Sequence, residues 1–137
     1  MGTLIAPDPL KTRLESVGSR IAKTKGTFLF RRGDAPSGVY LILSGEVRLG
    51  LERDPHGFPS RRIGPGSLLG LPSTLSNSPY SLTAEIIEDS EMIFVPSDQL
   101  RQLLRDQPDL CFDVMSILTE ELNQTRAALE RVHGPRL

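Results

Sequence analysis

Charge is missing from one long stretch of this chain. No residue from Gly64 to Ala84 is charged, although charged side chains make up 24% of the whole sequence. The stretch is rich in glycine, proline and serine, a composition typical of loops rather than of a membrane span. No window of the sequence approaches the roughly 18 apolar residues that a span needs, so we expect no membrane partner. We expect the uncharged stretch to form a loop and a short helix that close over part of the molecule.

Cysteine and histidine are scarce as well. Cys111 is the only cysteine, and His56 and His133 are the only histidines. The chain therefore lacks the ligands for a disulfide framework, an iron–sulfur cluster, a zinc site or the metal centre of a cupin enzyme. No G-x-S-x-G motif accompanies its serines, which argues against a serine hydrolase. We expect no enzymatic activity and no metal, a reducing cytoplasmic setting, and Cys111 as a small core residue of a buried helix.

An excess of basic charge is absent too. Lys and Arg together number 16 and Asp and Glu 17, which gives a formal net charge of −1. This balance offers no electrostatic footprint for nucleic acid, and the pairs Arg31-Arg32 and Arg61-Arg62 are expected to be solvated charge. The N-terminus lacks a basic start followed by a long apolar run, so we expect no signal peptide. The 137 residues are enough for one domain, residues 1–137, with a core of its own.

The hydrophobic pattern is helical at both ends of the chain and strand-like between them. It predicts a short helix within residues 1–18, alternating strands over residues 19–96, and two helices over residues 97–133. Turn signals such as Ser44-Gly45 and Glu88-Asp89-Ser90 separate the strands. The pattern therefore predicts a mainly β fold with flanking helices, a sandwich or small barrel of about eight short strands.

The final helix carries the strongest sign of a partner. We expect it to open at Pro108 and to run to about Val132, with a first half that is apolar nearly all round and buried against the barrel. In its second half, apolar residues recur at the 3-4-3-4-3 spacing of a coiled-coil seam. The stripe could instead pack on its own barrel, but we expect a homodimer in which Glu121 lies beside the partner's Arg126. The expected interface comprises Met115, Leu118, Glu121, Leu122, Thr125, Arg126 and Leu129.

Glycines recur in order at expected tight turns between strands, at Gly26, Gly33, Gly45, Gly66 and Gly70. The first three lie in KGTFLFRRGDAPSGVYLILSGEVRL, which resembles the signature of the cyclic-nucleotide-binding domain. The last two match the glycines that open the family's phosphate-binding cassette. The resemblance covers about residues 19–133 and implies a jelly-roll-like β-roll, or double-stranded β-helix, with a cassette helix and a long C-terminal dimerisation helix.

The long helix narrows the resemblance further. Its start, QPDLCFDVMSILTEEL, is similar to the dimerisation helix of bacterial transcription regulators of the catabolite-activator and fumarate-nitrate regulator type. Those regulators continue into a helix-turn-helix domain. This chain ends directly after the helix, so we expect no such domain in it and no DNA binding by this chain alone.

The resemblance places a ligand site in a cassette at residues 66–81. Nucleotide-binding members have a glutamate directly after the second cassette glycine and an arginine before a small residue. The matching positions here are Leu71 and Tyr80-Ser81, and none of these side chains carries a charge. Restoring the anchors by Leu71→Glu with Tyr80→Arg is expected to create nucleotide affinity. The implied ligand-binding residues are Gly70, Leu71, Pro72, Ser73, Tyr80, Ser81, Thr83 and Thr125.

The resemblance implies a regulatory, sensory and non-catalytic domain with a degenerate nucleotide site. Occupancy of the cassette would shift the long helix, and the dimer partner or an attached domain would read that shift. Three alternatives stay open for the ligand: a cyclic nucleotide, another small molecule, or none. In the last case the chain would be a protein-interaction and dimerisation module. No cofactor is expected beyond a possible cyclic nucleotide.

Overall fold

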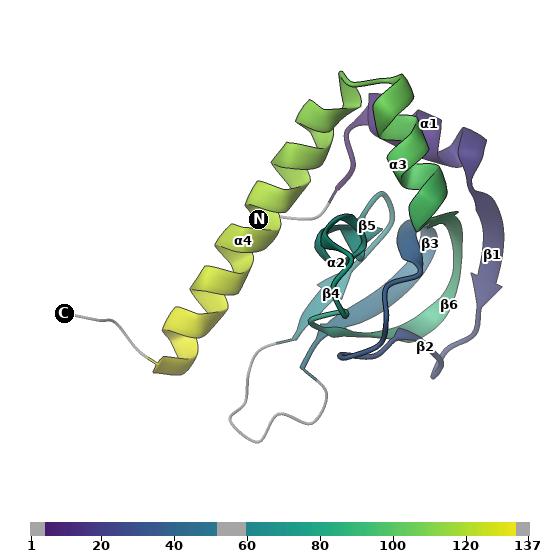
Figure 1. Cartoon of the computed structure of the whole chain (residues 1–137). Coiled ribbons are helices and arrows are strands. Elements are labelled where there is room, and N and C mark those ends of the chain that lie inside the picture. The colour runs from purple at the N-terminus through teal and green to yellow at the C-terminus, as the bar shows by residue number, and fades with distance from the viewer. Residues whose placement is uncertain (1–4, 52–59, 134–137) are drawn as a thin grey trace.

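The computed structural model of the protein describes residues 5–51 and 60–133, with side chains described as far as residue 123. In these residues an antiparallel six-stranded sheet, curled on itself, is flanked by helices. Figure 1 shows α1 and α3 together above the sheet, α2 against it, and α4 running past its side. The elements are α1 Asp8–Val17, β1 Ser19–Lys23, β2 Phe28–Phe30, β3 Gly38–Gly50, β4 Arg61–Ile63, β5 Leu68–Leu69, α2 Leu71–Ser76, β6 Thr83–Pro96, α3 Ser97–Asp106 and α4 Leu110–His133.

Two long strands, β3 and β6, form the centre of the sheet. They pair antiparallel over their whole length, from Gly38 opposite Pro96 to Gly50 opposite Thr83. The sheet order is β1-β6-β3-β4, with β2 paired to β6 and β5 paired to β3. The predicted mainly β fold with flanking helices is confirmed. The jelly-roll connectivity stays a prediction.

The described residues contain six strands where about eight short ones were expected. The difference arises because two turn signals mark irregularities inside strands rather than strand ends. Ser44-Gly45 lies within β3, where the register with β6 shifts repeatedly between Ile42 and Val47. Gly45 has a φ of 95°, a left-handed conformation that suits a β-bulge and that costs glycine least. Glu88-Asp89-Ser90 likewise lies within β6.

The core has two parts, one on each face of β3. Alternate β3 residues point to opposite faces, so Val39 and Leu41 pack with the helices while Tyr40 and Ile42 pack inside the curled sheet. Burial on both faces explains the unbroken apolar run at the start of this strand. Leu10 and Leu14 of α1 are fully buried in the helical part of the core. No helix among the described residues is long and apolar enough to cross a membrane.

The first half of α4 is not buried all round, and that prediction is wrong. Only Leu110, Val114 and Ile117, which lie on one face of the helix, are buried against the rest of the domain. Phe112 is 74% exposed and Met115 58% exposed. Cys111 is also exposed, so its expected role as a core residue is wrong as well. One side of the helix is enough to complete this core, and among the described side chains of α4 the large apolar groups of Phe112, Met115 and Leu122 are exposed.

Candidate effector site at the cassette and α4

The glycine frame of the cassette is present. Gly66 and Gly70 have φ values of 89° and 86°, in the left-handed region where a side chain would be strained. Between them β5 pairs with β3, and α2 begins directly after Gly70. A Cβ atom on Gly70 would lie 3.1 Å from the carbonyl oxygen of Gly38 and 3.1 Å from the ring of Tyr80. The cassette therefore packs closely on the start of β3.

Leu71 is part of the hydrophobic core. Its side chain is fully buried in the part of the core that β3 shares with α1, α3 and α4. The position that carries a ribose-binding glutamate in the resembled family is here a core position. A leucine is suited to it because a buried carboxylate without a partner would be strongly unfavourable.

Tyr80 is likewise buried and makes its contacts within the protein. It is only 3% exposed, and its ring stacks on that of Phe30 with centroids 3.9 Å apart. Its hydroxyl donates a hydrogen bond to the carbonyl of Gly38 at 2.9 Å and accepts one from the amide of Ser37 at 3.1 Å. Its own amide donates to the carbonyl of Asp34 at 2.9 Å. Tyr80 thus joins the end of the cassette to the loop between β2 and β3.

Several hydroxyl groups in and beside the cassette also form hydrogen bonds with backbone groups. Ser73 Oγ donates to the carbonyl of Pro79 at 3.2 Å, and Thr83 Oγ1 accepts the amide of Arg32 at 3.0 Å. Thr74, which the sequence did not single out for its side chain, donates to the Gly38 carbonyl at 2.9 Å. Ser81 is exposed and Pro72 is partly buried. The side chain of Thr125 lies outside the described residues.

A second group of candidate residues lies between β4 and α4, and the sequence did not identify it. The two arginines expected to be solvated differ: Arg62 is exposed and pairs with Glu46 at 3.5 Å, whereas Arg61 is partly buried. Burial lowers the pKa of Arg61, and the carboxylates of Glu121 and Glu120 on α4 oppose that shift. The sequence could not predict this difference in burial, because two adjacent arginines at a strand end do not indicate which of them points inward.

Glu121 faces Arg61 from α4. Burial raises the pKa of the Glu121 carboxyl to about 7, and the charge of Arg61 lowers it in part. Its expected partner in a dimer, Arg126, has a side chain outside the described residues, so the interchain pair stays a prediction. Met115 and Leu122 of the expected seam are exposed, while Leu118 is partly buried against its own core. The side chains of Thr125 and Leu129 lie outside the described part.

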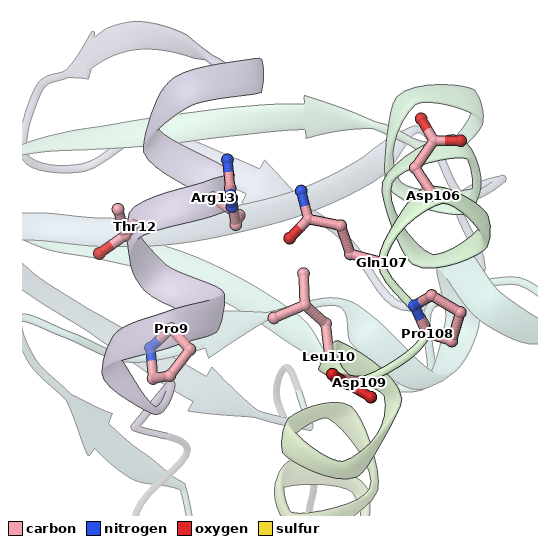
Figure 2. Close-up of a pocket in the computed structure, with 8 residues that line it drawn as sticks. All are labelled: Pro9, Thr12, Arg13, Asp106, Gln107, Pro108, Asp109 and Leu110. Carbon is pink, nitrogen blue, oxygen red and sulfur yellow. The ribbon is translucent and has the colours of Figure 1, made fainter.

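An open cavity of about 800 Å³ lies elsewhere, between α1 and the connection from α3 to α4 (Figure 2). Figure 2 shows Arg13 of α1 and Gln107 of the connection pointing into the space between these elements. Its lining contains none of the cassette positions: Pro9, Thr12, Arg13, Asp106, Gln107, Pro108, Asp109 and Leu110. Within the described ranges, no group of three or more His, Cys, Asp or Glu side chains could hold a metal ion. His56 lies outside the described residues, and so does the side chain of His133.

Known proteins resemble this chain along most of its length. It is 28% identical over 135 residues to the "Anaerobic regulatory protein" of Bacillus subtilis, covering 96% of this chain and 56% of the relative. It is 28% identical over 129 residues to the "Cyclic AMP receptor protein" of Thermus thermophilus, covering 92% and 58%. The crystal structure of the Thermus thermophilus catabolite activator protein superimposes with a TM-score of 0.74 at 27% identity, covering 93% of this chain and 60% of that one.

The chain thus spans less than two thirds of the length of these curated relatives. The family profile described as "Cyclic nucleotide-binding domain" matches residues 21–107, from β1 to the end of α3. That range contains the paired β3 and β6, the cassette glycines and α2. The chain therefore belongs to the cyclic nucleotide-binding domain family and is similar to the regulators of the cyclic AMP receptor type.

Proposed function

We propose that this chain is a regulatory, non-catalytic domain whose cassette no longer holds a cyclic nucleotide. One observation carries the proposal: Leu71 and Tyr80, at the positions of the ionic anchors in the resembled family, are both buried, and the Tyr80 hydroxyl is hydrogen-bonded within the protein. The cassette, which includes α2, instead has a structural role: it holds the loop before β3 and the helix α3 together. Arg101 of α3 supports this connection by donating a hydrogen bond to the carbonyl of Thr74 at 2.9 Å.

The binding free energy lost with the two anchors is large enough to determine the affinity for a cyclic nucleotide. A charge-assisted hydrogen bond contributes about 1.5–3 kcal/mol, and each 1.4 kcal/mol changes a dissociation constant about tenfold. Losing both anchors would move a micromolar ligand to about the millimolar range. We infer that a cyclic nucleotide is not the ligand at ordinary cellular concentrations.

Titration with nucleotides tests this proposal. A micromolar site would stabilise the protein by about 4 kcal/mol at millimolar ligand, whereas a millimolar site would add about 0.4 kcal/mol. We expect cyclic AMP, cyclic GMP and cyclic dinucleotides at millimolar concentration to leave the melting temperature within about 2 °C of the ligand-free protein. Linear AMP at the same concentration serves as the control for non-specific effects. A saturable rise with any cyclic nucleotide, absent with AMP, would contradict the proposal.

We propose that the output of the domain passes through α4 to a second copy of the chain. Phe112, Met115 and Leu122 are 74%, 58% and 58% exposed, and they recur three and seven residues apart along one side of the helix. Such a row of large apolar side chains is expected to be covered in solution. The seam predicted from the sequence shares Met115 and Leu122 with this row.

A charge in the row should dissociate the dimer. We expect Leu122→Glu to give a monomer by sedimentation equilibrium at concentrations at which the unsubstituted chain is a dimer, because two carboxylates would be desolvated at the interface. Asn123→Glu is the matched control, since Asn123 is the exposed neighbour of Leu122 outside the row. A dimer that survives Leu122→Glu would refute the interface.

The second candidate is a ligand-free interaction module, and the same exposed row of α4 favours it. In that case the cassette is core, α4 is the functional surface, and no small molecule binds. The two candidates differ in whether a ligand changes the dimer equilibrium. Regulation of transcription by a longer protein that contains this domain is part of the first candidate.

A further inference from the structure

The hydroxyl of Tyr80 lies in a small polar site formed by the backbone of Ser37 and Gly38. The amide of Ser37 donates to it at 3.1 Å and the amide of Gly38 at 3.3 Å. The hydroxyl in turn donates to the Gly38 carbonyl at 2.9 Å. A tyrosine hydroxyl has one proton to donate and lone pairs that accept. These bonds therefore satisfy the polar end of a side chain whose residue is only 3% exposed.

The two amides form a donor pair that needs an acceptor. They belong to consecutive residues, the last one of the loop before β3 and the first one of β3 itself. Successive backbone amides that point at one atom are a typical binding site for an anion or a ligand oxygen. An arginine at position 80, as in the resembled family, could not accept from them, because a guanidinium only donates. Tyr80 provides an oxygen at the place that a ligand oxygen would otherwise fill.

Further hydrogen bonds hold the cassette on the same loop. The amide of Tyr80 donates to the carbonyl of Asp34 at 2.9 Å, and its carbonyl accepts the amide of Gly33 at 2.8 Å. Thr74 of α2 donates to the Gly38 carbonyl at 2.9 Å, so that this carbonyl accepts from both α2 and Tyr80. We call this arrangement, in which the cassette is bonded to the start of β3, the closed cassette.

Aromatic packing keeps the phenol of Tyr80 in its site. The ring stacks on Phe30 of β2 with centroids 3.9 Å apart. Phe30 lies 6.0 Å from Tyr40 of β3, and Tyr40 lies 5.0 Å from Phe94 of β6. All four rings belong to the part of the core inside the curled sheet. The phenol is therefore held at its face by stacking and at its polar end by the two amides.

We propose that Tyr80 is the built-in occupant of the cassette. Its phenol fills the Ser37–Gly38 site and keeps the cassette closed without an effector, so the closed state is a property of the chain itself. This inference rests on the proposed function, since a cassette that binds no cyclic nucleotide needs another group to satisfy these amides.

Removal of the hydroxyl alone tests this role. Tyr80→Phe keeps the ring but leaves the amides of Ser37 and Gly38 without their acceptor. We expect hydrogen exchange of these two amides, followed by NMR, to become about tenfold faster or more. The amides of Gly26 and Ile86, which bond between β6 and the turn before β2, should change much less.

Tyr40→Phe is the matched control for this measurement. Tyr40 is the other tyrosine of the sequence and lies in the same group of rings, whereas both amides donate to Tyr80. It should leave exchange at Ser37 and Gly38 close to that of the unsubstituted chain. Equal acceleration at all four amides in Tyr80→Phe, or the same pattern in Tyr40→Phe, would make Tyr80 an ordinary packing residue and overturn the proposal.

Replacement of the lost phenol from solution gives an independent test. Tyr80→Ala removes the ring and its hydroxyl, which added phenol can replace together, whereas benzene replaces the ring alone. We expect phenol to raise the melting temperature of Tyr80→Ala saturably and more than benzene does. Neither compound should raise that of the unsubstituted chain, whose site is already filled. An equal response to both compounds in the variant, or an equal response to phenol in the two chains, would contradict a built-in occupant. If Tyr80→Ala does not fold, the exchange rates of Tyr80→Phe decide by themselves.

The outcomes separate this inference from the proposed function. If cyclic nucleotides leave the melting temperature unchanged, and Tyr80→Phe leaves exchange at Ser37 and Gly38 unchanged, the role of Tyr80 fails while the loss of the nucleotide site stands. If a cyclic nucleotide stabilises the unsubstituted chain, and Tyr80→Phe still accelerates exchange at these amides, the proposed function fails. The assignment of Tyr80 in the ligand-free chain then stands.

Discussion

Leu71→Glu is expected to lower the free energy of unfolding by about 4 kcal/mol or more, although it restores a residue type found in nucleotide-binding relatives. Leu71 is fully buried among α1, α3 and β3, so the substitution removes its packing and places a carboxylate in the core. Urea unfolding at neutral pH measures the loss, and the melting temperature should fall by more than about 10 °C.

Leu71→Met is the matched control, since it conserves the volume and should cost less than about 1.5 kcal/mol. The sequence alone leads to the opposite expectation, that Leu71→Glu with Tyr80→Arg would create nucleotide affinity. Burial changes that expectation, because Tyr80→Arg would also remove the stack on Phe30 and the bonds to Gly38. A double variant that stays folded and binds cyclic AMP would show that the cassette can open and would contradict this account.

Glu121→Gln is expected to remove much of the pH dependence of stability between about pH 4.5 and pH 7. Burial raises the pKa of Glu121 to about 7, whereas a glutamate in an unfolded chain titrates near 4.3. Between these values the folded protein keeps a proton that the unfolded chain has released, so stability falls as the pH rises. The side chain is partly buried, and the effect should be on the order of 2–3 kcal/mol.

Urea unfolding at pH 5 and pH 8 measures this effect. The unsubstituted chain should be less stable at pH 8 by this amount from Glu121 alone, and Glu121→Gln should narrow the gap. The charge of Arg61 on β4 acts on Glu121, and the charge of Glu120 on α4 acts on Arg61. Glu15→Gln on the exposed face of α1 is the control. Equal pH dependence in the unsubstituted chain and in Glu121→Gln would show that Glu121 is not the group responsible.

The fold was largely predictable because its signals are local. Helical periodicity at both ends, alternation between them, and glycines at tight turns all depend on residues close in sequence. The strand count was not predictable, since a glycine at a turn and a glycine at a bulge need the same backbone conformation. Gly45 shows this: only the pairing of β3 with β6 makes it part of one continuous strand.

Some features of the candidate site could likewise be predicted from the sequence, and others could not. That Leu71 and Tyr80 stand where charged anchors are found in the resembled family can be read from the sequence, because it depends on residue identity and order. That both are core, and that Arg61 rather than Arg62 lies inside, depends on which elements pack against them. A strand of three residues carries too little pattern to tell its two faces apart.

The sequence was enough to indicate the family, the succession of a helical, a strand-rich and a second helical region, the glycines of the cassette and the absence of charge in the cassette. Only the packing of distant elements shows that the uncharged stretch is held against the protein through Leu71 and Tyr80, and that the charge of Arg61 on β4 acts on Glu121 of α4. The reason is physical: backbone conformation and periodicity follow from neighbours in the chain. Burial and the pKa of a carboxyl group instead follow from neighbours in space, which here come from elements far apart in the sequence.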